Sequence, residues 1–243
     1  MNNIKAVELF YGWEEALIWS CLQGHMGTMI LDDEENPRSA MINIGDFCFF
    51  AGVPNDSLFN DIEGFKLLIP KDNDWEELIK NFFGKRVKRI LRYAIKKEPN
   101  IFDIEMLTSY VKALDDCYEL RLFDKEIFEL VKNEKWSEDL CSQFRDYNDY
   151  KSHAIGVAIL HNGKLVSGAS PYAVYDNGIE IEIDTKPEYR RKGLATVCGA
   201  KIILECLKHN IYPSWDAHDL RSVALAEKLG YHLSHPYVTY ELL

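Results

Sequence analysis

Three consecutive cations precede a glycine in the segment Arg190-Arg191-Lys192-Gly193, and Ala195 follows two positions later. A strand pattern ends just before this segment, and a helical pattern follows it. The start of a helix presents N–H groups without intrahelical acceptors at the positive end of the helix dipole, and small residues let a ligand approach that backbone. This arrangement favours binding of a phosphate or pyrophosphate. The alternative is a basic turn that begins a surface helix.

Three carboxylates lie on the predicted strand that leads into this basic turn. Glu180, Glu182 and Asp184 alternate with isoleucines, so their side chains share one face of the strand. Burial of three acids is costly unless they meet cations, water or one another, and their mutual repulsion should raise the pKa of at least one of them. They are candidates for proton transfer or for attraction of a cation. The alternative is a strand whose polar face is simply hydrated.

Other patterns that could carry chemistry are weak. The six cysteines are widely spaced, without a C-x-x-C pair or a Cys/His set at zinc spacing. His232 and His235 have no third ligand at a recognisable spacing, so we expect no metal site. The motifs G-x-x-x-x-G-K-[ST] and G-x-G-x-x-G do not occur in the chain. The basic turn therefore indicates a different kind of phosphate site.

The composition disfavours several classes of partner. The chain has 243 residues and a formal net charge of −11, with 13 basic and 21 acidic residues up to Leu120 and 15 and 18 after it. Nucleic acids and anionic membranes are bound through clustered Lys and Arg, so we expect neither as a partner. The longest strongly apolar stretch, Phe47 to Val53, is far shorter than the roughly 20 residues of a spanning helix. No secretion-signal pattern precedes it, and we expect a cytoplasmic protein.

The second half of the chain has a regular order of elements. Three strand patterns over 154–160, 164–174 and 179–185 are joined by Asn-Gly turns, which are strong hairpin signals, and they predict an antiparallel meander. The helix after the basic turn runs to about Lys208. Its expected core positions are Leu194, Val197, Cys198, Ile202 and Ile203. The other expected elements are strands over 118–123 and 212–217 and helices over 125–132, 137–144 and 219–229.

The first half carries most of the acidity and no phosphate motif. We expect helices over 4–22, 74–83 and 104–114 and strands over 27–31, 40–51, 65–69 and 87–96. These patterns divide the chain into an N-terminal α/β domain, residues 1–115, and a second domain, residues 116–243.

The charged segment carries a family resemblance. Arg190-x-x-Gly193-x-Ala195 resembles [Q/R]-x-x-G-x-[G/A], the acetyl-coenzyme A motif of the GNAT superfamily of N-acetyltransferases. About thirty residues later, the stretch from Asp219 to Tyr231 resembles the superfamily's final helix and its leucine-glycine-aromatic ending. The chain further resembles the branch with zwittermicin-resistance-type acetyltransferases. This resemblance implies an α/β (α+β) fold with a mixed, mostly antiparallel central sheet flanked by helices. The order of the first half suggests a degenerate GNAT-like unit.

The resemblance also implies how acetyl-coenzyme A, the cosubstrate, would bind without a metal. In the superfamily the pantothenate arm pairs with the strand before the motif, and the pyrophosphate lies on the N–H groups of the motif. The thioester would lie where that strand diverges from the next, near 215–217. The implied cofactor-binding residues are Ile183, Asp184, Thr185, Arg190, Arg191, Lys192, Gly193, Leu194, Ala195, Thr196, Asp219 and Ser222.

The catalytic residues follow the resemblance less closely. The superfamily often places a base on the strand before the motif, and we expect Glu182 in that role, directly or through water, with Glu180 and Asp184 attracting a cationic acceptor. Many members carry a tyrosine as proton donor four residues before the glycine that ends the last helix, but Ala226 stands there. The nearest substitutes are His218, Ser222 and Tyr231, of which His218 is our candidate. Solvent could also protonate the thiolate.

Three functions fit this sequence. The first is an acetyl-coenzyme A-dependent N-acetyltransferase that acts on a small, cationic amine. The second is a coenzyme A-binding sensor or structural module that has lost turnover, as Ala226 would allow. The third is an acyltransferase acting on protein amino groups. The oligomeric state stays open, with a homodimer as one option.

Overall fold

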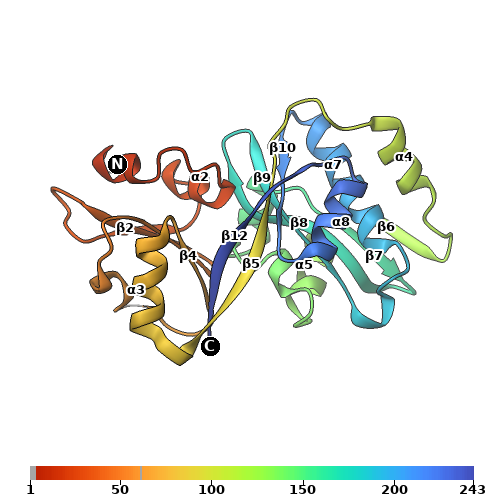
Figure 1. The fold of residues 1–243 in the computed structure, drawn as a ribbon. Helices are drawn as coiled ribbons and strands as arrows, with labels where there is room; N and C mark the ends of the chain where they lie inside the picture. Colours follow the sequence, from red (N-terminus) through yellow and green to blue (C-terminus); the bar gives the residue numbers. More distant parts are fainter. Residues whose placement is uncertain (1–3, 61) are drawn as a thin grey trace. The chain divides into compact units, whose positions relative to one another are not determined.

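The computed structural model describes residues 4–60 and 62–243, and its chain divides into two compact units (Figure 1). Unit 1 contains the described residues up to Arg92 together with Pro236–Leu243, and unit 2 contains Tyr93–His235. This division differs from the expected one at 115/116. Helix α4 (Ile104–Lys112) lies in unit 2 because it packs along helix α7 (Leu194–Lys208), and the chain's last eight residues belong to unit 1.

Unit 1 is built on a mostly antiparallel sheet. The strand order is β1-β2-β3-β4-β12-β5, in which β3 and β4 are parallel. Strands β5 and β12 continue past the boundary into unit 2. The elements are α1 (Ile4–Leu9), α2 (Ala16–Leu22), β1 (Thr28–Leu31), β2 (Ser39–Ile44), β3 (Phe47–Gly52), η1 (Asp56–Phe59), β4 (Lys66–Pro70), α3 (Asn73–Phe83), η2 (Gly84–Arg86), β5 (Val87–Ile95) and β12 (Leu233–Leu242).

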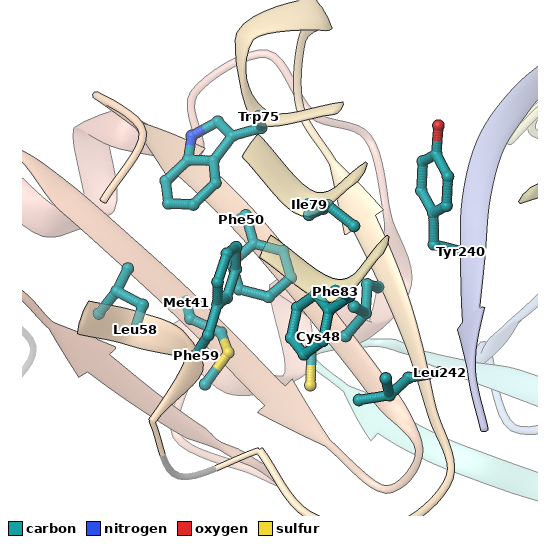
Figure 2. Close-up of a cluster of buried hydrophobic side chains, with 11 residues drawn as sticks. Met41, Cys48, Phe50, Leu58, Phe59, Trp75, Ile79, Phe83, Tyr240 and Leu242 are labelled. Atoms are coloured by element: carbon teal, nitrogen blue, oxygen red, sulfur yellow. The ribbon is translucent and has the colours of Figure 1, made fainter. Parts of the chain in front are cut away.

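An aromatic core stabilises unit 1. The rings of Phe50 and Trp75 lie 5.2 Å apart, those of Phe59 and Phe83 lie 5.0 Å apart, and all four side chains are buried. Figure 2 shows them with further buried side chains from β2, η1, α3 and β12, namely Met41, Leu58, Ile79, Tyr240 and Leu242. Large buried rings contribute strongly to the hydrophobic stabilisation of a fold.

Two expectations for the first half were wrong, each at a glycine. The expected helix over 4–22 is two helices, α1 and α2, and Gly12 adopts a positive φ of 76° in the turn between them. The expected strand over 40–51 is the hairpin of β2 and β3, which turns at Gly45 with φ 54°. Both turns lie within apolar runs, where periodicity alone does not reveal them.

Unit 2 contains a five-stranded sheet with the order β10-β9-β8-β7-β6. The predicted meander of β7, β8 and β9 is confirmed, and Asn162 and Asn177 take positive φ angles in its two turns. The further elements are β6 (Tyr118–Leu122), α5 (Lys125–Lys132), η3 (Glu138–Leu140), α6 (Tyr147–His153), β7 (Val157–His161), β8 (Lys164–Tyr175), β9 (Gly178–Thr185), η4 (Pro187–Tyr189), β10 (Tyr212–Ser214), β11 (Asp216–Ala217) and α8 (Leu220–Lys228).

Two further expectations were wrong in unit 2. The segment 137–144 forms only the short helix η3, and α6 follows where no element was expected. The run 212–217 is not one strand, because β10 pairs with β9 whereas β11 pairs with β5. The helix predicted to end at Lys208 is confirmed as α7, and all five of its expected core residues are buried.

Candidate functional site

Strands β9 and β10 pair for three residues and then separate. They run in parallel, with Tyr212 opposite Gly178 and Ser214 opposite Glu180. Beyond Ser214 the chain enters β11, which pairs with Tyr93 and Ala94 of β5. We call the point after Glu180 and Ser214 the strand fork. Within the described residues no strand pairs with this edge of β9 over 181–185, so an extended ligand could pair with the edge there.

The two faces of β9 meet different elements. A Cβ atom on Gly199 of α7 would lie 3.2 Å from Ile183 Cδ1, which places the isoleucine face against α7. The other face is located through Gly168 of β8, which lies directly opposite Asp184 in the strand pair. A Cβ atom built on Gly168 would lie 2.8 Å from Leu140 Cδ1 of η3, so the Asp184 side chain, on the same face, also points toward η3. The three carboxylates of β9 therefore share the face toward η3 and α6. We call this the acidic face.

The acidic face becomes more open from the strand fork toward the basic turn. Glu180 is only 4% exposed, whereas Glu182 and Asp184 are half-buried. The pKa of Asp184 is raised to about 6, first by burial and then by the Asp139 carboxylate of η3, against the opposing charge of Arg190. As expected, one carboxyl group of the acidic face has a raised pKa. Besides burial, the charge that raises it is Asp139 of η3 and not a neighbouring carboxylate of β9.

Tyrosines surround Glu180 at the strand fork. The Tyr175 hydroxyl lies 2.6 Å from Ser214 Oγ, the side chain opposite Glu180 in the strand pair. The Tyr231 hydroxyl donates to the Pro213 carbonyl at 2.7 Å, and its pKa is raised well above the ordinary value by burial first, with the charge of Glu180 contributing. Tyr231 therefore fixes β10 and is poorly suited to donate a proton to a leaving group.

The basic turn leads into a helix that has no capping side chain. Gly193 is the N-cap residue of α7, with φ 81° in the left-handed region, and among the described residues no side chain accepts a hydrogen bond from the first turn. The first helical bond runs from Val197 N–H to Gly193 O at 3.2 Å. A Cβ atom on Gly193 would meet nothing within 4 Å, so the space beside this backbone is open. The N–H groups of the first turn are thus available to an anion.

Side-chain contacts hold the basic turn in place. Arg190 Nε donates to the Thr185 carbonyl at 3.2 Å and ties the turn to the end of β9. The Tyr189 hydroxyl lies 2.9 Å from His161 Nδ1, and Lys192 Nζ lies 4.6 Å from the centre of the Tyr189 ring. Arg191 and Lys192 are exposed, so the charge faces solvent or a ligand.

The start of α8 uses its polar residues within the protein. Asp219 accepts hydrogen bonds from the N–H groups of Arg221 and Ser222 at 2.8 and 3.1 Å and forms an ion pair with Arg221. Hydrogen bonds from Arg221 lower the pKa of Asp219 to about 2. Ser222 Oγ accepts from Trp215 Nε1 at 3.0 Å. His218 is exposed.

The expected site residues of β9, the basic turn and the start of α7 thus follow one another along a single strand–turn–helix segment. No sequence signal points to five further residues, because each comes from an element outside the β9–α7 segment: Asp139, His161, Tyr175, Ser214, and Lys228, which donates to Thr196. In the described part of the chain, no group of three or more His, Cys, Asp and Glu side chains is placed to hold a metal ion. No helix there is both long enough and apolar enough to cross a bilayer.

The donor set at α7 fits the anionic part of coenzyme A, because uncapped N–H groups and exposed cations meet at one helix start. A model of the GNAT acetyltransferase family matches residues 7–240. The "Uncharacterized N-acetyltransferase YdfB" of Bacillus subtilis (strain 168) is 26% identical over 230 residues, which cover 88% of this chain and 85% of that protein.

Solved structures agree with this match. The crystal structure of a GCN5-related N-acetyltransferase-like protein from Streptococcus suis 89/1591 is 43% identical, with a TM-score of 0.94 over 97% of this chain and 96% of that one. A tandem GNAT protein from the clavulanic acid biosynthesis pathway has a TM-score of 0.56 over 98% of this chain and 93% of that one, and at 12% identity it shows the fold alone. The chain belongs to the GNAT acetyltransferase family and is an N-acetyltransferase.

Proposed function

We propose that the enzyme transfers the acetyl group of acetyl-coenzyme A to the amine of a small, cationic molecule at the strand fork. One observation supports this proposal most strongly. The part of β9 whose outer edge pairs with no described strand is followed along the chain by the basic turn and the uncapped start of α7. All of these residues lie in unit 2, and we assign no cofactor role to unit 1.

The chain's residues would hold the cofactor in two ways. The backbone of Ile183, Asp184 and Thr185 would pair with its extended arm, and the N–H groups from Arg191 to Thr196 would hold its pyrophosphate. Arg191 and Lys192 would add charge from the solvent side. When bound, acetyl-coenzyme A supplies the activated thioester carbonyl that the amine attacks.

A carboxylate of the acidic face would take the proton of the incoming ammonium group. We assign this role to Glu182, because it is half-buried and lies two residues beyond the strand fork on the acidic face. Glu180 is almost fully buried and would meet the cationic group of the acceptor deeper in the site. Asp184, with a pKa of about 6, is ionised at neutral pH and would add attraction for a cationic acceptor.

Protonation of the leaving thiolate depends less on a dedicated protein residue than deprotonation of the amine does. The tyrosine position of the family is occupied by Ala226, which is fully buried, and Tyr231 is bonded to β10. A thiol has an ordinary pKa of about 8.5, so its thiolate leaves readily without a dedicated acid. We keep His218, which precedes the N-cap residue of α8, as the candidate donor and solvent as the alternative.

The test is release of free thiol from acetyl-coenzyme A across a panel of amines that includes diamines and aminosugars. We expect turnover with at least one cationic amine and an approximately 100-fold lower kcat for Glu182→Gln with unchanged cofactor affinity. Glu227→Gln, at an exposed position on α8, is the matched control and should behave as wild type.

Three outcomes would contradict parts of this proposal. Binding of coenzyme A without turnover on any amine would favour the sensor function. Absence of coenzyme A binding would remove the cofactor assignment altogether. An unchanged kcat in Glu182→Gln would exclude Glu182 as the base.

A further inference from the structure

We propose that Lys228, the last residue of α8, is a phosphate contact for the cofactor at the start of α7, and that Tyr110 of α4 positions it. This inference rests on the proposed function, because it adds a residue to the same site. Lys228 lies outside the basic turn and outside every cofactor position that the motif implied.

The geometry brings the Lys228 ammonium group to the first turn of α7. Lys228 Nζ donates to Thr196 Oγ1 at 3.3 Å, across a sequence separation of 32 residues. Thr196 is the third residue of α7 and is 8% exposed. A cation from another helix therefore lies beside the N–H groups that we assign to the pyrophosphate.

Electrostatics explain why this placement indicates a ligand. The start of a helix is the positive end of its dipole, and a cation there is unfavourable. Arg190, Arg191 and Lys192 already occupy the preceding turn. Addition of Lys228 gathers four cations at one positive helix end, an arrangement that becomes favourable when a multiply charged anion binds.

The protein holds Lys228 without neutralising it. Its Nζ lies 5.2 Å from the centre of the Tyr110 ring, and the Tyr110 hydroxyl donates to the Lys228 carbonyl at 3.4 Å. The described residues show no carboxylate within ion-pair distance of this ammonium group, whereas Lys201 and Lys208 of α7 both pair with Glu205. The charge of Lys228 is therefore available to a phosphate.

Coenzyme A carries two kinds of phosphate, the pyrophosphate and the ribose 3′-phosphate. The experiment is isothermal titration of the full chain with coenzyme A and with 3′-dephospho-coenzyme A. We expect Lys228→Met to weaken coenzyme A binding about tenfold, as loss of one charge-assisted contact predicts. Lys228→Arg should restore the affinity to within about threefold, and circular dichroism melting checks that each variant is folded.

Lys112→Met is the matched control, because Lys112 is also an exposed last residue of a helix in unit 2, and its affinity should equal that of wild type. A loss confined to coenzyme A assigns Lys228 to the 3′-phosphate, and an equal loss with both ligands assigns it to the pyrophosphate. Wild-type affinity in Lys228→Met overturns the inference alone. Failure of wild type to bind coenzyme A overturns the proposed function instead.

Discussion

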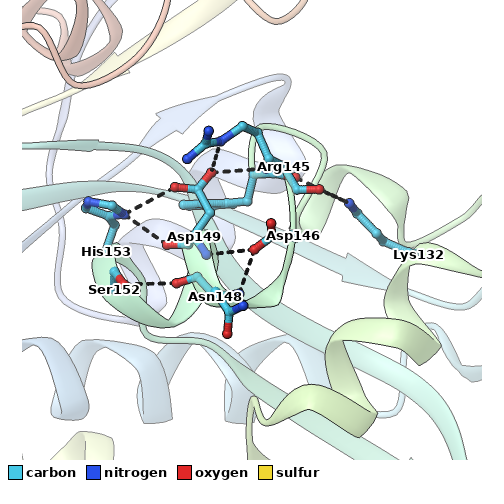
Figure 3. Close-up of polar contacts among 8 residues, drawn as sticks. Lys132, Arg145, Asp146, Asn148, Asp149, Ser152 and His153 are labelled. Atoms are coloured by element: carbon cyan, nitrogen blue, oxygen red, sulfur yellow. Dashed lines mark hydrogen bonds and ion pairs between the residues drawn. The ribbon is translucent and has the colours of Figure 1, made fainter.

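Helices α7 and α8 each follow a strand that leaves the strand fork, and they begin in opposite ways. Helix α8 starts at Asp219, whose carboxylate accepts from two N–H groups of its own first turn. Aspartates cap α3, α4, α5 and α6 in the same manner, and Figure 3 shows Asp146 of α6 accepting from the N–H groups of Asn148 and Asp149. Helix α7 has Gly193 instead, without a capping side chain. This chain caps helices readily, so the bare start of α7 leaves its donors to a ligand.

Two aspartates extend this comparison. The carboxyl group of Asp219 meets donors and a guanidinium group, which lower its pKa to about 2. The carboxyl group of Asp184 meets burial and Asp139, which raise its pKa to about 6. The charge of Asp219 is therefore stabilised by hydrogen bonds from its own helix. The charge of Asp184 is destabilised by its surroundings and lowers the stability of the folded protein, at a position beside the proposed acceptor.

The largest effect is expected when α7 is given the aspartate that the other helices have. Gly193→Asp would place a negative charge where a phosphate should bind, at a left-handed position that aspartate tolerates better than most side chains. We expect coenzyme A affinity to fall by at least about 100-fold, measured by titration calorimetry. Gly193→Asn is the control without charge, because asparagine tolerates the left-handed conformation, and its loss should be near tenfold. Affinity within threefold of wild type in Gly193→Asp would show that the start of α7 is not the anion site.

A smaller effect is expected from neutralising Asp184. Its folded-state pKa lies above the ordinary value of 3.8, so the folded state binds more protons than the unfolded state between about pH 4 and 6. The charge therefore lowers stability above this window. Asp184→Asn should raise the free energy of unfolding by about 1–3 kcal/mol at pH 8, and the gain should vanish below pH 4.

Urea denaturation at several pH values measures this difference. Asp116→Asn, at an exposed position of unit 2, is the control and should show no such pH dependence. A gain in Asp184→Asn that is constant from pH 4 to 8 would contradict the burial of this carboxylate as its cause.

The smallest effect is expected at the start of α8. Asp219→Ala removes a helix cap and should lower the free energy of unfolding by about 1 kcal/mol, seen as a lower melting temperature. Because the folded-state pKa of Asp219 is lowered to about 2, this contribution is present above pH 4 and is lost as the pH falls from 4 to 2.

Coenzyme A affinity of Asp219→Ala should stay within threefold of wild type, because the carboxylate is bonded to its own helix. A tenfold loss of affinity would show instead that Asp219 contacts the cofactor, as its place in the family motif implied. Asp219→Asn keeps a capping oxygen and should retain most of the stability.

Much of the candidate site could be predicted because it is local in sequence. The alternation of Glu180, Glu182 and Asp184 follows from strand geometry, and the basic turn follows from its position before a helix. The family assignment from two motifs is confirmed. The wrong expectations arose where apolar runs hide a turn, as at Gly45, or where one strand pattern serves two sheets, as over 212–217.

By itself the sequence determined the charge pattern, the meander, the core face of α7 and the basic turn, because hydrophobic periodicity and turn residues act on neighbouring positions. Only the tertiary structure decided where β9 and β10 separate, how deeply Glu180 lies, that Asp139 raises the pKa of Asp184 and that Lys228 reaches Thr196. The physical reason is that burial and electrostatic interaction depend on distance in space, which packing sets between elements far apart in the chain.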